Sequence, residues 1–246
     1  MNRGLGAPWV NDNQKKFNRG KICGENSPCL EVATENLGNK YYSLGPPYIV
    51  HKDDMARIAE SWTTFVPRVY EGYPYSLAEM YAYSMAAAHE RLPHLRLDNF
   101  MVSNTEAGGE GWDWVDKLED PCMEPVNGIF FPGAPLPTFL HYCQFFLAGD
   151  MAFGKRRVPH EIFTCESGLL LEPPPKLGES EYKLGKKGGK ISEDKKEKLS
   201  RTQAMRNAFM ICTAHRALNA AATDFKKRNC GPDANYQKTV DLADNK

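Results

Sequence analysis

Apolar residues recur every three to four positions along three segments of the chain, and this spacing predicts amphipathic helices. The first helix is expected to begin at Asp53, with Pro67 kinking or shortening its last turn. The second follows Ser76 and the third begins at Ser200, each with the Ser-x-x-Glu/Gln pattern of a capping box. The stripe of the first helix comprises Met55, Ile58, Trp62, Phe65 or Val66, and Val69, and that of the third comprises Met205, Phe209, Cys212, His215, Leu218, Ala222 and Phe225.

Runs rich in branched and aromatic residues lie between the second and third helices and predict strands. The clearest are residues 138–146 (TFLHYCQFF) and 161–165 (EIFTC), and shorter strands are expected at 47–50, 100–102 and 128–131. The presence of both helices and strands predicts a mixed α/β fold.

Composition along the chain predicts five parts. Residues 1–46 are rich in Gly, Asn and Pro and are expected to be mostly loop, with a short helix near residues 12–18. Residues 47–175 form the expected main domain, and the lysine-rich residues 176–199 form a linker or insertion. Residues 200–231 form a terminal helix that ends at Gly231-Pro232, and residues 232–246 form a tail.

Charge and hydropathy narrow the classes of function. The 31 basic and 31 acidic residues balance, so there is no basic surplus of the kind that nucleic-acid binding usually requires. No stretch approaches the length of an apolar membrane span, and the N-terminal residues lack the apolar region of a signal peptide. The seven cysteines fit either disulfides in an oxidising compartment or buried free thiols.

Three places could carry chemistry, and each has a structural alternative. Glu79 could act as a carboxylate in a site, although a capping role opposite Ser76 explains it at least as well. His141, in a β-prone run, could bind a metal or could be a core histidine. Residues 153–157 (FGKRR) could hold a diphosphate through Gly154 and Lys155, or could be an exposed basic cluster.

These three places occur together in one known family. The chain resembles the peptidyl serine α-galactosyltransferases and, more distantly, the hydroxyproline O-arabinosyltransferases of plants and green algae, with gaps, from about residue 45 to residue 231. The resemblance rests on residues 51–55 (HKDDM), 77–84 (LAEMYAYS), 98–101 (DNFM), 140–142 (LHY), 153–155 (FGK), 163–165 (FTC), 172–175 (EPPP), 216–219 (RALN) and 229–231 (NCG).

The resemblance implies a GT-A-like glycosyltransferase, with a mixed sheet and flanking helices, that transfers sugar from a UDP-sugar to serine or hydroxyproline of a glycoprotein. It assigns a Mn²⁺ ligand to His141 and diphosphate contacts to Lys155, near Gly149 and Gly154. It places Glu79 on the acceptor side. The chain would correspond to the C-terminal half of the catalytic domain.

The same resemblance implies a Golgi or ER lumen, where a Cys165–Cys230 disulfide would tether the terminal helix. One departure is clear: the Asp-x-Asp pair that such enzymes use for the metal is absent from this sequence. We therefore expect either a truncated enzyme, or a short non-catalytic relative that binds a glycoprotein or a protein partner. An interaction protein without sugar chemistry is the third hypothesis.

Overall fold

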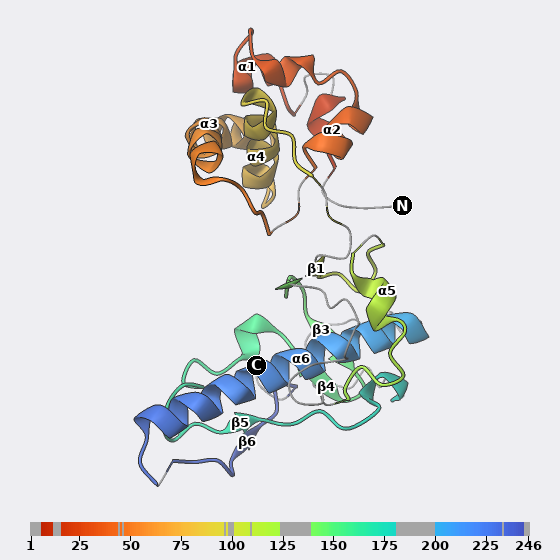
Figure 1. Ribbon diagram of the computed structural model, residues 1–246, viewed down its shortest axis with the longest axis vertical. Helices are drawn as coiled ribbons and strands as arrows, with labels where there is room; N and C mark the ends of the chain where they lie inside the picture. The colour runs from red at the N-terminus through yellow and green to blue at the C-terminus, as the bar shows by residue number, and fades with distance from the viewer. Residues whose placement is uncertain are drawn as a thin grey trace. The chain divides into compact units, whose positions relative to one another are not determined.

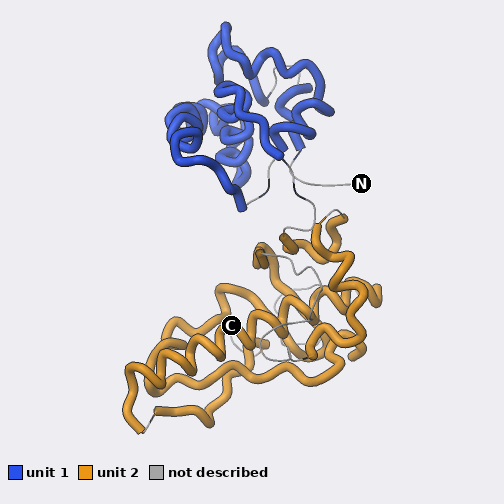
Figure 2. The backbone as a smooth tube through the Cα atoms, viewed as in Figure 1, with its two compact units in different colours: residues 1–97 blue, residues 98–246 orange. Residues whose placement is uncertain are grey.

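The computed structural model describes residues 6–11, 16–43, 45, 47–95, 97, 101–108, 110–123, 139–180, 200–232 and 234–243. The chain divides into two compact units, residues 1–97 and residues 98–246 (Figure 2). The boundary falls inside the segment 47–175 that the sequence predicted as one domain. Residues 1–46 are not a separate loop-rich part, because their buried side chains belong to the same core as the first two predicted helices.

The first unit, residues 1–97, contains helices in its described part (Figure 1). The α-helices are α1 (Arg19–Cys23), α2 (Glu35–Tyr41), α3 (Lys52–Gly72) and α4 (Ala78–His89), and the 3-10 helices are η1 (Pro8–Val10) and η2 (Pro28–Glu31). Of the helix expected at residues 12–18, residues 12–15 lie outside the described part, and Asn18 instead caps α1 by accepting the amide of Lys21.

Two long helices organise this unit. Helix α3 buries Ile58, Phe65 and Val69 as its periodicity predicted, and it continues past Pro67 to Gly72. Helix α4 is buried at every residue from Tyr81 to Ala88, and its small side chains allow close packing against α3.

The second unit, residues 98–246, pairs one long helix with short strands. In the described part, β1 (Met101–Val102) pairs in parallel with β2 (Phe139–Leu140), and β5 (Leu169–Leu170) pairs in parallel with β6 (Thr239–Val240). Strands β3 (Phe146–Ala148) and β4 (Met151–Phe153) form an antiparallel hairpin. The other elements are α5 (Trp112–Val115), η3 (Lys155–Arg157), η4 (Leu177–Glu179) and α6 (Arg201–Asn229).

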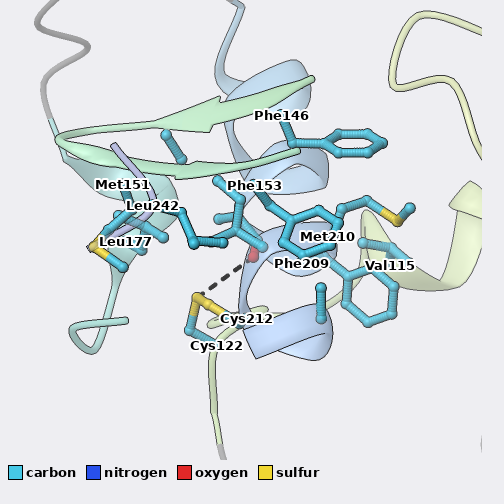
Figure 3. Packing of buried hydrophobic residues seen from close by; sticks show 14 of the residues in the cluster. Val115, Cys122, Phe146, Met151, Phe153, Leu177, Phe209, Met210, Cys212 and Leu242 are labelled. Atoms are coloured by element: carbon cyan, nitrogen blue, oxygen red, sulfur yellow. Dashed lines mark hydrogen bonds between the residues drawn. A yellow bond between two sulfur atoms is a disulfide. The ribbon is translucent and has the colours of Figure 1, made fainter. Parts of the chain in front are cut away.

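Helix α6 is the axis of this unit's core (Figure 1). It begins with the predicted capping box, in which Ser200 accepts the amide of Gln203 and the Gln203 side chain accepts the amide of Ser200. Figure 3 shows Phe209 and Met210 of α6 packed with Phe146 and Phe153 of the hairpin. Burial of this apolar stripe supplies most of the helix's stability, since a helix in water is only marginally stable.

Two disulfides fasten α6 to the rest of its unit. Cys165 and Cys230, the pair expected from the resemblance, are bonded with their Cα atoms 5.6 Å apart. Cys122 and Cys212 form a second disulfide, which the sequence did not reveal (Figure 3).

The mixed helix-and-strand composition is confirmed, but several expected strands are not. Residues 47–50 and 161–165 form no strand, and the run 138–146 is interrupted between β2 and β3. The expected strand at 128–131 lies outside the described residues. Within the expected linker, Leu177 is buried in the α6 core, while residues 181–199 lie outside the described part. Among the described helices, none is both long enough and apolar enough for a membrane span.

Candidate functional site

The five residues predicted for a site lie in both units. Glu79 is in the first unit, whereas His141, Gly149, Gly154 and Lys155 are all in the second.

The His141 segment follows directly after β2. The backbone amide of His141 donates to the carbonyl oxygen of Val102 at 2.9 Å, which extends the β1–β2 pairing by one residue. The carbonyl of His141 then accepts the amide of Cys143, so the chain turns at this point. The side chain of His141 is half-buried. His141 consequently lies just after a strand that ends at Leu140, whereas the β-prone run 138–146 predicted that it would lie within one.

Tyr142 fixes this segment to the core of the unit. Its hydroxyl donates to the carbonyl oxygen of Met210 at 3.0 Å, and burial raises the pKa of its phenol. Its ring lies edge-on to Phe146 at 5.7 Å and to Phe153 at 4.9 Å, measured between centroids. Sequence reasoning noted this tyrosine only as part of a motif.

The contact between Tyr142 and Phe153 brings two of the predicted site segments together. His141 immediately precedes Tyr142, and Gly154 and Lys155 immediately follow Phe153. The ring centroids of Tyr142 and Phe153 are 4.9 Å apart. The backbone segments that carry His141 and Lys155 therefore start from neighbouring residues in the core.

Gly149 is explained by the turn of the β3–β4 hairpin. Its φ of 52° lies in the left-handed region, and a Cβ there would come within 2.9 Å of the Ser180 side chain. Gly149 also lines a cavity of about 500 Å³ with Asp150, Glu172 and other residues. Two carboxylates on this lining do not favour a diphosphate, because like charges repel. Nucleotide binding by Gly149 remains a prediction.

Gly154 is required for packing. A Cβ at this position would lie 2.6 Å from the ring of Phe145, closer than side-chain atoms approach one another. The backbone of Gly154 is extended, with φ −151°, so space rather than conformation explains the glycine.

The three cations after Gly154 have different environments. Arg157 stacks over the Phe145 ring at 4.4 Å and donates to the carbonyl oxygens of Leu242 and Ala243, so it joins η3 to residues 242–243. Lys155 and Arg156 are exposed. These two side chains are the ones in the motif that can reach an anion in solvent.

Glu79 lies exposed in the first turn of α4, and its predicted capping box is wrong. The helix begins at Ala78 after Leu77, with no side-chain cap, so Ser76 and Glu79 do not cap each other. The backbone carbonyl of Glu79 accepts a hydrogen bond from the Trp62 indole at 2.7 Å. Helix capping therefore does not explain the glutamate at position 79, and a functional role for its carboxylate remains a prediction.

An aromatic cluster adjoins Glu79 within the first unit. The Trp62 ring lies edge-on to Tyr83, which stacks on Tyr48 at 4.5 Å and shares a 2.8 Å hydrogen bond with His94 Nε2. Burial raises the pKa of Tyr48 to about 12, raises that of Tyr83 further, and lowers that of His94. At neutral pH these groups are uncharged.

The residues that the structure describes offer few ligands for a metal ion. Among them, no group of three or more His, Cys, Asp or Glu side chains is close enough to hold a metal ion. His141 contributes one nitrogen, whereas transition-metal sites in proteins usually use three or four ligands. The described residues therefore do not fit a complete Mn²⁺ site.

Comparisons with known proteins return no relative. The chain matches no known family model, no curated protein and no solved structure.

Proposed function

We propose that this chain is part of a glycosyltransferase that transfers sugar from a UDP-sugar to serine or hydroxyproline hydroxyls of a glycoprotein, in a GT-A-like fold. The observation that carries the proposal is the Tyr142–Phe153 contact, because it brings together the segments of His141 and Lys155. The sequence resemblance assigns both residues to the same UDP-sugar site.

Lys155 is the residue that would contact the diphosphate. Departure of UDP leaves negative charge on the phosphate oxygens, and a lysine ammonium placed there stabilises the transition state. Lys155 is exposed at the start of η3, whose last residue, Arg157, is anchored to the Leu242 carbonyl at 3.2 Å. An anchored backbone suits anion binding, since the main chain that carries Lys155 loses little conformational entropy when an anion binds.

The implied Mn²⁺ would neutralise charge on the diphosphate. His141 is the residue that would bind it, through a neutral ring nitrogen. The described residues supply no further ligands that would complete its coordination.

Glu79 would act on the acceptor. An exposed carboxylate that caps no helix can accept the proton of a serine or hydroxyproline hydroxyl, or orient that hydroxyl for attack. The carbonyl contact with Trp62 fixes the backbone from which the carboxylate projects.

Two disulfides support a lumenal location such as the Golgi or ER. Disulfides persist in oxidising compartments and are rare in the cytosol. Cys122–Cys212 and Cys165–Cys230 both join α6 to distant parts of its unit.

The first experiment measures binding of UDP to the chain by calorimetry, with and without Mn²⁺. We expect the Lys155→Ala substitution to weaken binding about tenfold or more, because a hydrogen bond to a charged group is worth about 1.5–3 kcal/mol. Arg156→Ala is the matched control, since it removes an exposed cation from the adjacent position. Equal losses in the two variants would show nonspecific attraction, and absence of UDP binding by the unsubstituted chain would contradict the proposal.

The second experiment separates the acceptor role from nucleotide binding. Glu79→Gln should lower sugar transfer to a serine- or hydroxyproline-rich peptide while leaving UDP affinity unchanged. Glu71→Gln, an exposed glutamate near the end of α3, is the control. Peptide binding without UDP binding would favour a non-catalytic glycoprotein-binding module instead.

A further inference from the structure

Two buried thiols face each other in the first unit. The sulfur atoms of Cys23 and Cys29 lie 2.6 Å apart, and both residues are free cysteines in this structure. Cys23 is the last residue of α1 and Cys29 lies in η2. Their exposed fractions are 6% and 0%, so solvent does not separate them.

This separation is shorter than the 3.5–4.0 Å at which nonbonded carbon atoms pack, and it approaches the ~2.05 Å of a disulfide bond. Sulfur is larger than carbon, so the contact leaves little room for two thiol hydrogens. A covalent bond would relieve this crowding.

The local backbone holds the two cysteines together. Gly24 follows Cys23 with a φ of 96°, a left-handed value that favours glycine and turns the chain back at the end of α1. Ser27 then caps η2 by accepting the amide of Cys29. The guanidinium of Arg19 in α1 donates to the carbonyl oxygen of Cys29 at 3.2 Å, so a side-chain hydrogen bond also joins α1 to the backbone of η2.

We propose that Cys23 and Cys29 form a third disulfide, which closes a short loop between α1 and η2. Each thiol gives up one hydrogen, a sulfur–sulfur bond forms, and the two electrons reduce the disulfide of an oxidised dithiol oxidoreductase to its dithiol. The two disulfides of the second unit indicate that the same class of oxidant acts on this chain.

The pair fits a structural cross-link rather than a catalytic dithiol. The hydrogen bond from Cys23, together with burial, raises the pKa of Cys29 well above its ordinary value, and a reactive cysteine needs a lowered pKa. The cross-link would instead fix the intervening loop. Ser27 in that loop lies 2.7 Å from Nδ1 of His89, at the end of α4, so the loop supports the helix that carries Glu79.

The proposal does not depend on the transferase activity, and its test needs no substrate. The chain is secreted from cells with an added, cleavable signal peptide, denatured without reductant, and alkylated. Trypsin leaves both cysteines in residues 22–40, which contain no internal Lys or Arg. A glutamate-specific protease then cleaves after Glu25, between the two cysteines.

We expect the fragments 22–25 and 26–31 to remain joined, with neither cysteine alkylated, and to separate after reduction. Cys143, which is exposed, should be alkylated in full. Cross-linked peptides containing Cys122–Cys212 and Cys165–Cys230 serve as internal controls for oxidation. Alkylation of Cys23 and Cys29, whatever the state of the controls, would overturn the proposal.

A variant gives an independent measurement. In Cys23→Ser, Cys29 should become alkylated, which adds one label to the denatured chain, and the cross-links of the second unit should be unchanged. If Cys29 carries the same label before and after the substitution, the thiol was already free and the proposal fails. Because alkylation follows denaturation, the result does not depend on how well the variant folds.

Discussion

The side-chain nitrogen of Lys226 donates a hydrogen bond to the backbone carbonyl oxygen of Cys165, at 2.9 Å. The same nitrogen donates to the carbonyls of Thr164 and Ser167, so its three N–H groups meet three acceptors. Lys226 is fully buried, and Cys230, one turn later, is bonded to Cys165. The end of α6 is thus held to the loop 164–167 both by hydrogen bonds and by a covalent bond.

Replacing Lys226 by Met should lower the free energy of unfolding of the second unit by at least about 2 kcal/mol, because buried carbonyl acceptors are left unpaired. Urea denaturation under oxidising conditions measures the change. Lys227→Met, at an exposed neighbouring position, should change it by less than about 0.5 kcal/mol. A Lys226→Met variant as stable as the Lys227→Met control would show that the three hydrogen bonds contribute nothing.

Gly154→Ala should also destabilise the second unit. The added Cβ would meet the Phe145 ring at 2.6 Å, and such overpacking typically costs about 1–3 kcal/mol. Gly231→Ala is the control, because a Cβ there meets nothing within 4 Å. Thermal unfolding of the two variants provides the comparison.

A double substitution tests whether Phe145 is the cause. In a Phe145→Ala background the ring that opposes the new Cβ is gone, so the additional effect of Gly154→Ala should largely disappear. An undiminished effect would mean that Gly154 is required for another reason, such as close approach of a ligand. The experiment therefore separates the packing role from the nucleotide-binding role that the sequence suggested.

The parts of the fold that depend on local chemistry were predictable from the sequence. The capping box at Ser200 is made within four residues, and it is present. The same pattern at Ser76 is misleading, since the amide of Ala78 donates to the carbonyl of Tyr75 and a turn displaces Ser76 from the capping position. The Ser-x-x-Glu/Gln pattern is therefore compatible with a capped and with an uncapped helix start. The turn before the helix determines which of the two forms.

Features that depend on distant partners were not predictable. Residues 161–165 have the composition of a strand but form turns, and part of this loop is held by Lys226, about 60 residues away. In the candidate site, nothing in the sequence FGKRR shows that Arg157 binds the carbonyl of Leu242 whereas Lys155 is exposed. The role of Tyr142, which depends on Met210, was missed for the same reason.

His94 should make the stability of the first unit depend on pH. Its backbone amide donates to the carbonyl of Tyr41 at 2.7 Å, and its Nε2 shares a hydrogen bond with Tyr83. Burial lowers its pKa in the folded chain below the ordinary value of 6.5. In the pH range between the folded and the unfolded pKa, the unfolded chain therefore binds more protons than the folded one.

The sign of the effect follows from that difference. The contribution of His94 to stability is fully present above the unfolded pKa, and it is lost as pH falls through the folded pKa. Hydrogen–deuterium exchange of peptides from α3 and α4, measured at about pH 7.5 and about pH 5, should show faster opening at the lower pH after correction for intrinsic exchange rates. His94→Gln should reduce this pH dependence, whereas His51→Gln, at an exposed position of the same unit, should retain it. If His94→Gln retains the full pH dependence, another group is responsible and the buried imidazole is not the sensor.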